Sequence, residues 1–372
     1  MSNSTLNSNL LTPHTPTSRE ELWRFTPLNK LRGLHDVDVA LSSRISLRGR
    51  SEASLPAGAA ISIVDANSTA PVSQTKDLVS LRVRGTAEKV LLLEIAPNTE
   101  IVEPIFLTRT FESLDPEVSR TLIKLGANSR ATVVVENSGS ITLAEELEMV
   151  LDTGTTLNFV SLQEWENDAV HLGHHHAVIG KDASFNSTVI TLGGSLVRLL
   201  PTVDYAGPGS SAELSGLYFA TSGQHLEHRV HVDHNLAHAK SRVNYKGALH
   251  GDNARTVWFG DVFIHANAQG TDTYEVNRNL LLSDGARADS VPNLEIETGE
   301  IVGAGHASTT GRFDDEQLFY LESRGIPTKI ARQLVIRGFF LEIVSALSRL
   351  GLSEIEERIM SRIETELEKA AV

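Results

Sequence analysis

GANSRATVVV, residues 126–135, joins a short polar turn to an apolar run rich in β-branched residues. The same unit returns as DTGTTLNFV at 152–160 and as GKDASFNSTVI at 180–190. Short runs of this kind, without helical spacing and with many valine, isoleucine and threonine residues, indicate β-strands. The segment from about 79 to 310 is therefore predicted to consist of many short strands.

The turns between these strands carry glycines at nearly constant distances. Gly126, Gly154, Gly180 and Gly209 follow one another at intervals of 28, 26 and 29 residues. One unit repeated at a fixed period is typical of a solenoid, in which each turn of the chain stacks on the next. No repeat of individual residues accompanies the spacing, and a β-sandwich would show similar runs. Small turn residues and an aromatic content of 5% favour the solenoid, with the sandwich as the alternative.

The N-terminal part of the chain is predicted to differ from this β-core. Residues 1–17 are rich in serine, threonine, asparagine and proline, which predicts a disordered leader. Residues 18–78 are predicted to be helical or irregular. Ser18 and Glu21 have the spacing of a capping box, and Pro27 is expected to end the helix that follows.

The C-terminal part is predicted to be helical from residue 313 to residue 372, which leaves 79–312 for the β-core. Asp314 can cap a first helix that ends before Gly325. A second helix carries a broad apolar face, and Ser353 with Glu356 forms a capping box at the start of a third. The three helices are expected to form a compact domain.

Composition excludes several classes of function. The net charge is −14, with scattered lysines and arginines, which argues against a nucleic-acid partner. No apolar run approaches the 18 or so residues of a membrane span, and the first residues lack the layout of a secretion signal, so a cytoplasmic protein is expected. A phosphate loop of the form GxxxxGK[ST] is absent, so no nucleotide is expected to bind this chain.

The chain contains no cysteine. Disulfides, thiolate nucleophiles and cysteine-based metal sites are therefore impossible. A metal ion would have to be bound by histidine or carboxylate side chains.

Histidines are concentrated in one part of the chain, with eleven of the fourteen between His171 and His265. Residues 174–176 form a triplet, and a second series, with spacings of three, three, three and four, consists of His225, His228, His231, His234 and His238. On a helix the series would share one side and could bind metal, whereas on a strand neighbouring members face opposite sides. The intervening residues favour strands, so histidines on the surface or lining the solenoid are predicted. A standalone metal-binding protein is the alternative.

Four segments in the last fifth of the chain, read in order, resemble the SufB/SufD family of iron–sulfur cluster assembly proteins. They are PNLEI (292–296), GAGHASTTG (303–311), LFYLESRGI (318–326) and ARQLVIRGF (331–339). LWRFTPL (22–28), VHVDH (230–234) and DTYEVNRNLLLS (272–283) add weaker similarity to family segments. The resemblance implies a right-handed parallel β-helix flanked by N-terminal and C-terminal helical segments.

Within this family the lack of cysteine favours the SufD type, because SufB chains carry cysteines that accept sulfur and hold the nascent cluster. The resemblance then implies a non-catalytic subunit that pairs with SufB and binds SufC, an ABC-type ATPase, through its C-terminal helices. The residues expected at the partner contact are Phe319, Arg324, Val335, Arg337, Phe339, Phe340 and Val344.

One histidine is the candidate ligand that the resemblance singles out. The family segment after LEI reads approximately C-x-H-x-A-T, and here Ala304 stands at the cysteine position and His306 at the histidine position. A neutral imidazole is a competent iron ligand. The resemblance implies that His306 binds iron, or a transient iron–sulfur cluster, together with ligands from SufB, and Glu297 is predicted to orient it. The alternative is a histidine that bonds to the backbone of its own loop.

A rival function comes from another class, the polysaccharide-active enzymes built on β-solenoids. Asp261, Asp272 and Glu275 are the carboxylates that could serve such an enzyme. The small number of aromatic residues and the missing secretion signal argue against it. Polar residues at 272–277 can instead form ladders between stacked turns, which is the favoured interpretation.

Overall fold

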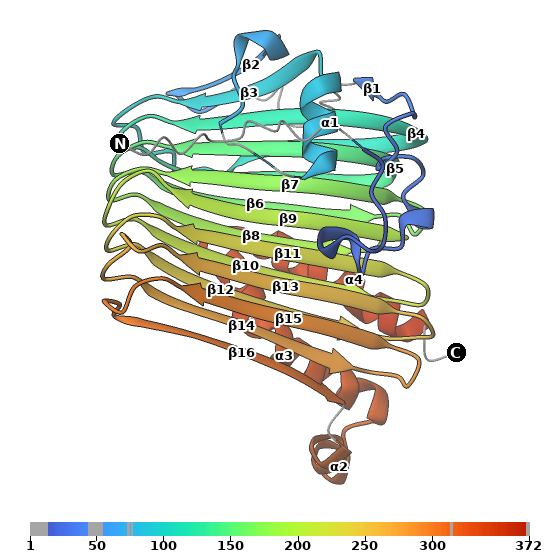
Figure 1. Ribbon diagram of the computed structural model, residues 1–372. Helices are drawn as coiled ribbons and strands as arrows, with labels where there is room; N and C mark the ends of the chain where they lie inside the picture. Colours follow the sequence, from blue (N-terminus) through green and yellow to red (C-terminus); the bar gives the residue numbers. More distant parts are fainter. Residues whose placement is uncertain (1–13, 44–54, 73–74, 76, 313–314, 370–372) are drawn as a thin grey trace.

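The computed structural model describes residues 14–43, 55–72, 75, 77–312 and 315–369. The leader predicted over 1–17 therefore lies outside the described residues except for its last four, and so does the cap predicted at Asp314. Within the described part, the chain coils into a flattened β-solenoid with two broad faces (Figure 1).

The sixteen strands of the described residues belong to one sheet, and from β6 onward each strand pairs with the next but one along the chain. One face contains β7 (Val170–Ile179), β9 (Leu196–Tyr205), β11 (His225–His234), β13 (Arg255–Ile264) and β15 (Arg287–Ile296). The other contains β6 (Thr156–Trp165), β8 (Ser184–Leu192), β10 (Ser211–Ala220), β12 (Lys240–Leu249), β14 (Asp272–Leu281) and β16 (Gly303–Arg312). Every pairing within these faces is parallel. This topology confirms the predicted β-solenoid and excludes the sandwich.

Two long strands connect the faces at the start of the stack. The first half of β5 (Arg130–Leu151) pairs with β6 and its second half pairs with β7, so β5 bends around the edge of the solenoid. β4 (Ile105–Leu125) pairs with β5 along its whole length and shows a register shift between Ser113 and Pro116. An antiparallel hairpin of β2 (Ala59–Asp65) and β3 (Lys89–Ile95) begins the sheet, and the short β1 (Ser42–Ser43) pairs with β4.

At one edge of the solenoid, a residue with the left-handed backbone conformation recurs from turn to turn. Two residues before each of the strands β5, β6, β8, β10, β12 and β14, the backbone has positive φ, at Asn128, Gly154, Asp182, Gly209, His238 and Gly270. Glycine, asparagine and aspartate tolerate this conformation best, which explains most of these residue types. Successive members are 26, 28, 27, 29 and 32 residues apart, so the turns of the solenoid lengthen toward its C-terminal end.

The interior between the two faces is a continuous hydrophobic core. Alternate residues of each strand point inward, as expected for a pleated strand. The core includes large side chains without solvent exposure, such as Phe159, Trp165 and Trp258. Because each turn contributes a layer, this core runs the length of the stack.

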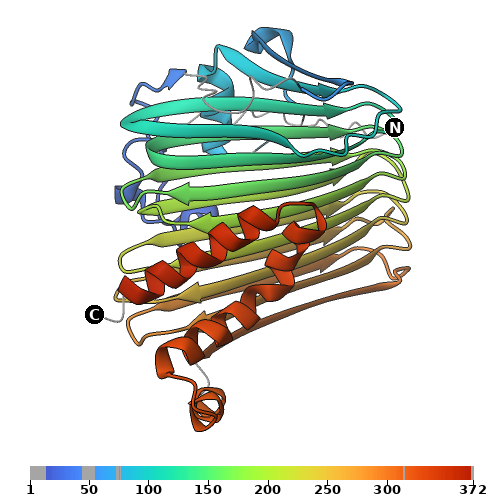
Figure 2. The same ribbon diagram turned by 180° about the vertical axis from the view of Figure 1, so that it is seen from behind.

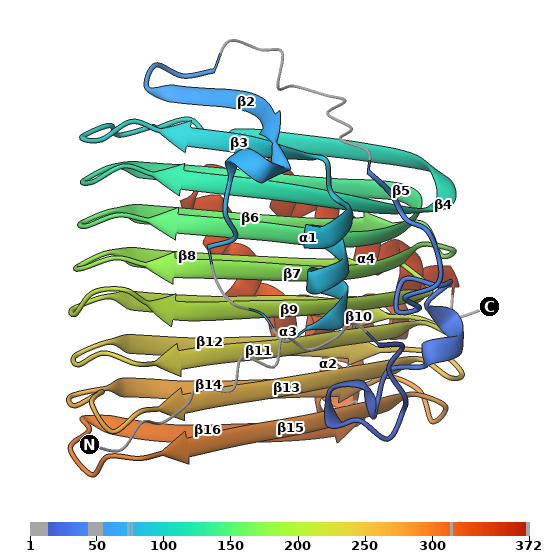
Figure 3. The same ribbon diagram turned by 45° about the horizontal axis from the view of Figure 1, so that its top comes forward.

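The N-terminal segment and the helix α1 (Leu78–Thr86) cover the outer side of the face that contains β7, β9 and β11 (Figures 1 and 3). Trp23, Leu31 and Leu34 are buried there together with residues of α1. In place of the helix predicted to begin near Ser18 and to end at Pro27, the chain forms two short 3-10 helices, η1 (Glu21–Trp23) and η2 (Leu28–Lys30), and η4 (Ala66–Ser68) follows further on. β1 and β2 lie within the segment predicted to be helical or irregular but belong to the sheet, whereas residues 79–86, predicted as part of the β-core, are helical.

Three C-terminal helices follow the solenoid, as predicted: α2 (Asp315–Ser323), α3 (Thr328–Arg349) and α4 (Ser353–Lys369). α3 and α4 lie across the outer side of the second face (Figure 2). They bury Ile336, Phe340 and Ile359 against apolar side chains of β5, β6, β8, β10 and β12. α2 lies beyond β16, past the end of the stack. None of the helices in the described ranges is long and apolar enough to span a membrane.

Candidate functional site

His306 lies on β16, the last strand of its face (Figure 1). Its in-register partner on β14 is Glu275, and both residues stand at positions that face the interior of the solenoid. His306 is 42% exposed because no further turn covers the end of the stack, whereas Glu275 is 1% exposed. The Nδ1 atom of His306 lies 3.8 Å from Oε1 of Glu275. A histidine and a carboxylate therefore meet at the open end of the solenoid.

Glu275 is an unusual member of its strand. Asn277 and Asn279 face inward on the same strand and form hydrogen bonds with Tyr218 and Ser290 from other strands, which supports the ladder interpretation for those two residues. In contrast, neither carboxylate oxygen of Glu275 has a hydrogen-bond partner among the described residues. Burial first, and then the negative charge of Asp261, raise the pKa of Glu275 to about 8.

The residues around His306 differ in part from the sequence-based expectation. Ala304, two residues earlier on β16, packs against the interior core and faces the same side. Glu297 follows β15 and accepts a hydrogen bond from the backbone N–H of Ala266, and its Oε2 lies 3.8 Å from Nδ1 of His265. Among the contacts of the described residues, the carboxylate beside His306 is that of Glu275, not that of Glu297.

The clustered histidines are divided between the two sides of the sheet, as predicted for strands. In the triplet, His174 and His176 bond to Thr202 on the outer side, whereas His175 packs on Phe159 in the interior. In the longer series, His225 contacts Glu227, while His228 bonds to Thr191 and His234 to Ser241. His238 is a turn residue with positive φ. In the described part of the chain, no group of three or more histidine, aspartate or glutamate side chains is arranged to hold a metal ion.

The carboxylates considered for a polysaccharide-active enzyme do not form one site. Asp261 accepts a hydrogen bond from Asn293, and Asp272 forms an ion pair with Arg242. Glu275 faces the interior, so the two aspartates are already engaged elsewhere and do not converge with it. The geometry gives this rival function no support.

The residues predicted to contact a partner fall into three groups by exposure. Phe319, on α2, is 71% exposed, and Arg324 and Arg337 are also exposed. Val335 and Phe339 are half-buried. Phe340 and Val344 were assigned wrongly, because both are buried between α3 and the outer side of the solenoid. The apolar face of α3 is used mainly to attach this helix to its own chain.

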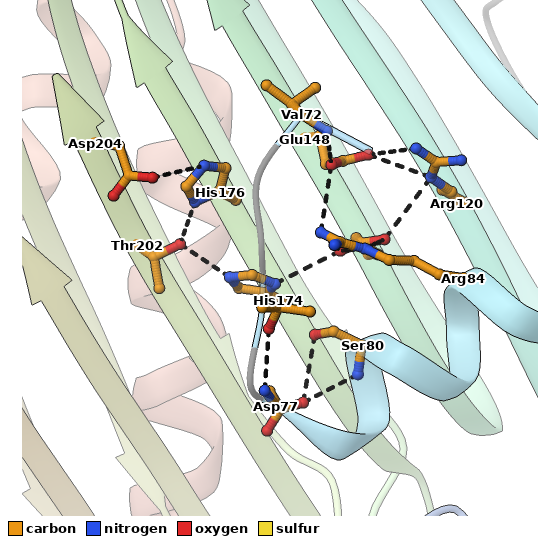
Figure 4. A network of polar contacts seen from close by, with 12 residues as sticks. Val72, Asp77, Ser80, Arg84, Arg120, Glu148, His174, His176, Thr202 and Asp204 are labelled. Carbon is orange, nitrogen blue, oxygen red and sulfur yellow. Dashed lines mark hydrogen bonds and ion pairs between the residues drawn. The ribbon is translucent and has the colours of Figure 1, made fainter. Parts of the chain in front are cut away.

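A buried network of charged side chains was not predicted from the sequence (Figure 4). Arg84 on α1 bonds to Glu146 on β5, and Arg120 on β4 bonds to Glu148. These contacts hold α1 on the sheet, close to His174. Arg198 on β9, two strands beyond β5 on the same face, makes a similar set of contacts with Asp77 and Glu227. The alternation of charged and apolar residues in β5 (AEELEM, 144–149) is the sequence signal of the Glu146 and Glu148 pair.

Together these features define a parallel β-solenoid protein whose candidate ligands lie at the end of the stack, where a second chain can reach them. The family model for the SufBD core domain of the SUF system of iron–sulfur cluster assembly matches residues 109–339. Iron–sulfur cluster assembly SufBD family proteins of Mycobacterium bovis and Mycobacterium leprae are 46% and 45% identical to this chain. The alignments cover 95% of this chain and 89% and 90% of those proteins.

The iron–sulfur cluster assembly protein SufD of Escherichia coli is 26% identical over 387 residues, which cover 95% of this chain and 90% of that protein. The chain belongs to the SufBD family of iron–sulfur cluster assembly proteins. The resemblance inferred from the C-terminal segments is thereby confirmed.

Proposed function

We propose that this chain is a SufD-like, non-catalytic cytoplasmic subunit of an iron–sulfur cluster assembly complex. In this complex it pairs with a SufB-like paralogue and binds a SufC-like ABC ATPase, and His306 supplies a ligand to iron or to a transient cluster at the interface. The observation that carries the proposal is His306 itself. In a chain without cysteine, an imidazole stands half-exposed at the open end of a solenoid whose family assembles iron–sulfur clusters.

The end of the stack offers a second argument for pairing with a paralogue. In the described part of the sheet, β15 and β16 are the last strands of their faces, so each has a strand neighbour on one side. Edge strands present unpaired N–H and C=O groups, which favour the addition of a strand from another chain. A paralogue that extends the sheet at this end would bring its own side chains close to His306, including the sulfur ligands that this chain lacks.

The helices offer a separate surface for the ATPase. Tyr320, Ile330, Leu334 and Leu341 are exposed on α2 and α3 together with Phe319. We call these five residues the helical patch. Contiguous apolar residues on a surface mark sites of protein–protein contact. Ile330, Leu334 and Leu341 lie on α3, which crosses the outer side of the second face, whereas Phe319 and Tyr320 lie on α2, beyond β16. The patch therefore extends from the outer side of that face toward the open end of the stack.

The ligand role of His306 is tested by His306→Ala. This substitution should abolish cluster assembly in cells that lack other assembly routes, while the tagged subunit still co-purifies with the paralogue and the ATPase. The matched control is His265→Ala, which removes a histidine of similar exposure that also lies beside a carboxylate, that of Asp233. Normal assembly by an intact complex containing His306→Ala would show that the ligand role is wrong.

The helical patch is tested by two phenylalanine substitutions on neighbouring helices. Phe319→Ser should weaken ATPase binding by about tenfold or more, because exposed aromatic residues often dominate protein interfaces, and it should leave the melting temperature unchanged. Phe340→Ala should instead lower the free energy of unfolding by about 3–5 kcal/mol, because this side chain is fully buried. Pull-down of the ATPase and urea denaturation measure the two effects. Equal ATPase binding by wild type and Phe319→Ser would place the contact elsewhere.

A further inference from the structure

Glu275 is buried without a hydrogen bond to its carboxylate from any described residue, and the imidazole of His306 lies 3.8 Å from it. Other buried carboxylates of this chain are paired: Glu146 contacts Arg84 and Glu227 contacts Arg229. Both oxygens of Glu275 lack a hydrogen-bond partner among the described residues, although the side chain is 1% exposed. A buried carboxyl group without a hydrogen bond costs free energy. A purely structural role would be better served by an apolar residue or by a paired one.

A glycine next to Glu275 makes space for its side chain, and no neighbouring group in the described part of the chain forms a hydrogen bond with its carboxylate. Gly260 lies across the interior on β13, and a Cβ atom there would come within 2.2 Å of Oε2 of Glu275 and within 2.3 Å of the Trp258 ring. Any residue larger than glycine would displace the carboxylate. The glycine at position 260 therefore gives the Glu275 carboxylate the space that it occupies in the interior.

The separation of the two side chains suits one metal ion. Ligands at about 2.1 Å from a cation, with angles of 90–110°, lie roughly 3.0–3.4 Å from each other. The observed 3.8 Å between Nδ1 of His306 and Oε1 of Glu275 is close to this range, so a small side-chain rotation would suffice. Imidazole nitrogen and carboxylate oxygen are both common ligands of divalent first-row metals such as iron.

We propose that Glu275 is the second metal-binding side chain of this chain, so that the open end of the solenoid presents a nitrogen and an oxygen ligand together to one divalent cation. The proposal deepens the proposed function and rests on it in naming iron as the cation and a paralogue as the source of the other ligands. Two ligands make an incomplete site, in agreement with the lack of a three-residue cluster among the described residues. The chain alone should bind metal weakly.

The affinity test uses the purified full-length chain and Co²⁺ as the probe. Binding is followed by paramagnetic broadening of the His306 ring resonance, which His306→Gln identifies. Glu275→Gln keeps the size of the side chain and should raise the apparent Kd at least about tenfold. The matched control is Asp272→Asn, a carboxylate of the same strand that pairs with Arg242 and should not change the Kd. An unchanged Kd for Glu275→Gln would overturn the proposal.

A second measurement uses the wild-type chain and does not depend on the folding of a variant. Crystals soaked in Co²⁺ should show anomalous density within about 2.2 Å of a His306 nitrogen and of a Glu275 oxygen. Density on His306 alone would overturn the role of Glu275. Failure of the proposed function gives a different result, because the subunit would then not co-purify with a paralogue and an ATPase even if Co²⁺ bound to both side chains.

Discussion

Replacing Arg198 with methionine should lower the free energy of unfolding by about 3–5 kcal/mol, because the substitution leaves buried carboxylates without their charged partner. The Arg198 side chain has no solvent exposure, and its guanidinium lies 3.1 Å from Asp77 and 3.4 Å from Glu227. It also stacks over Trp23 at 4.2 Å. Arg198 therefore joins the N-terminal segment, the cap of α1 and the sheet.

Partners such as Arg198 stabilise the charged form of the buried carboxyl groups around it. Burial alone would raise the pKa of Glu227, but the hydrogen bond with His225 and the charges of Arg198 and Arg229 hold it well below its usual range. Urea denaturation measures the effect of Arg198→Met, and the matched control is Arg242→Met. Arg242 is exposed and pairs with Asp272, so its loss should cost about 0–1 kcal/mol. Similar losses for both variants would contradict the role assigned to Arg198.

A second large effect is expected in acid, and His228 provides the test. This ring has no solvent exposure, stacks on Tyr218 at 4.9 Å and bonds to Thr191 at 2.9 Å. Burial lowers the pKa of His228 to about 3. Between pH 6.5 and pH 3 the unfolded chain therefore binds a proton at this residue that the native chain does not. Stability falls as the pH falls through this window, by roughly 4–5 kcal/mol in total from His228 alone.

Other buried groups also make the stability depend on pH, and the direction of each effect follows from the direction of its pKa shift. Burial also lowers the pKa of His175 and His234 to about 4, so these residues add to the loss of stability in acid. Glu275 acts in the opposite direction, because its raised pKa favours the native state as the pH falls from about 8 to 4.5. The contribution of one histidine is therefore best isolated by comparing variants.

His228→Gln should remove about one proton from the pH dependence of stability between pH 6.5 and 4, whatever it costs at pH 7. Urea denaturation at a series of pH values gives this slope. The matched control is His238→Asn, which changes an exposed turn histidine to a residue that also tolerates positive φ. If His228→Gln and His238→Asn leave the same slope as wild type, the native state accepts a proton at His228 and the assignment is wrong.

The solenoid could be predicted from the sequence. The glycines whose spacing indicated it, however, come from two different positions of the turn. Gly154 and Gly209 occupy the left-handed position itself, whereas Gly126 and Gly180 stand two residues before it. The equivalent residues there are Asn128 and Asp182. A pattern based on glycine alone loses the repeat after Gly209, because the next member is His238. The conformation recurs, and several residue types satisfy it.

The candidate site was only half predictable. His306 was identified from the family segment around it, but Glu275 was considered as part of a polar ladder. Which residue faces His306 depends on the length of the turn, and turns of the solenoid range from 26 to 32 residues. The burial of α3 could not be inferred either, because its helical periodicity does not tell whether a face meets its own chain or a partner. Phe340 and Val344 were assigned to the partner for that reason.

The position of α4 has a consequence for the biosynthesis of the protein. Arg358 on α4 contacts Glu136 on β5, 222 residues earlier in the chain, and also Glu164 on β6. At 5–20 residues per second, a ribosome needs about 10–45 s to make the residues between Glu136 and Arg358. Throughout that time the outer apolar side chains of the first turns, including Val134 and Val160, lack their cover. The nascent chain thus exposes a hydrophobic surface that a chaperone can protect until the last helix leaves the ribosome.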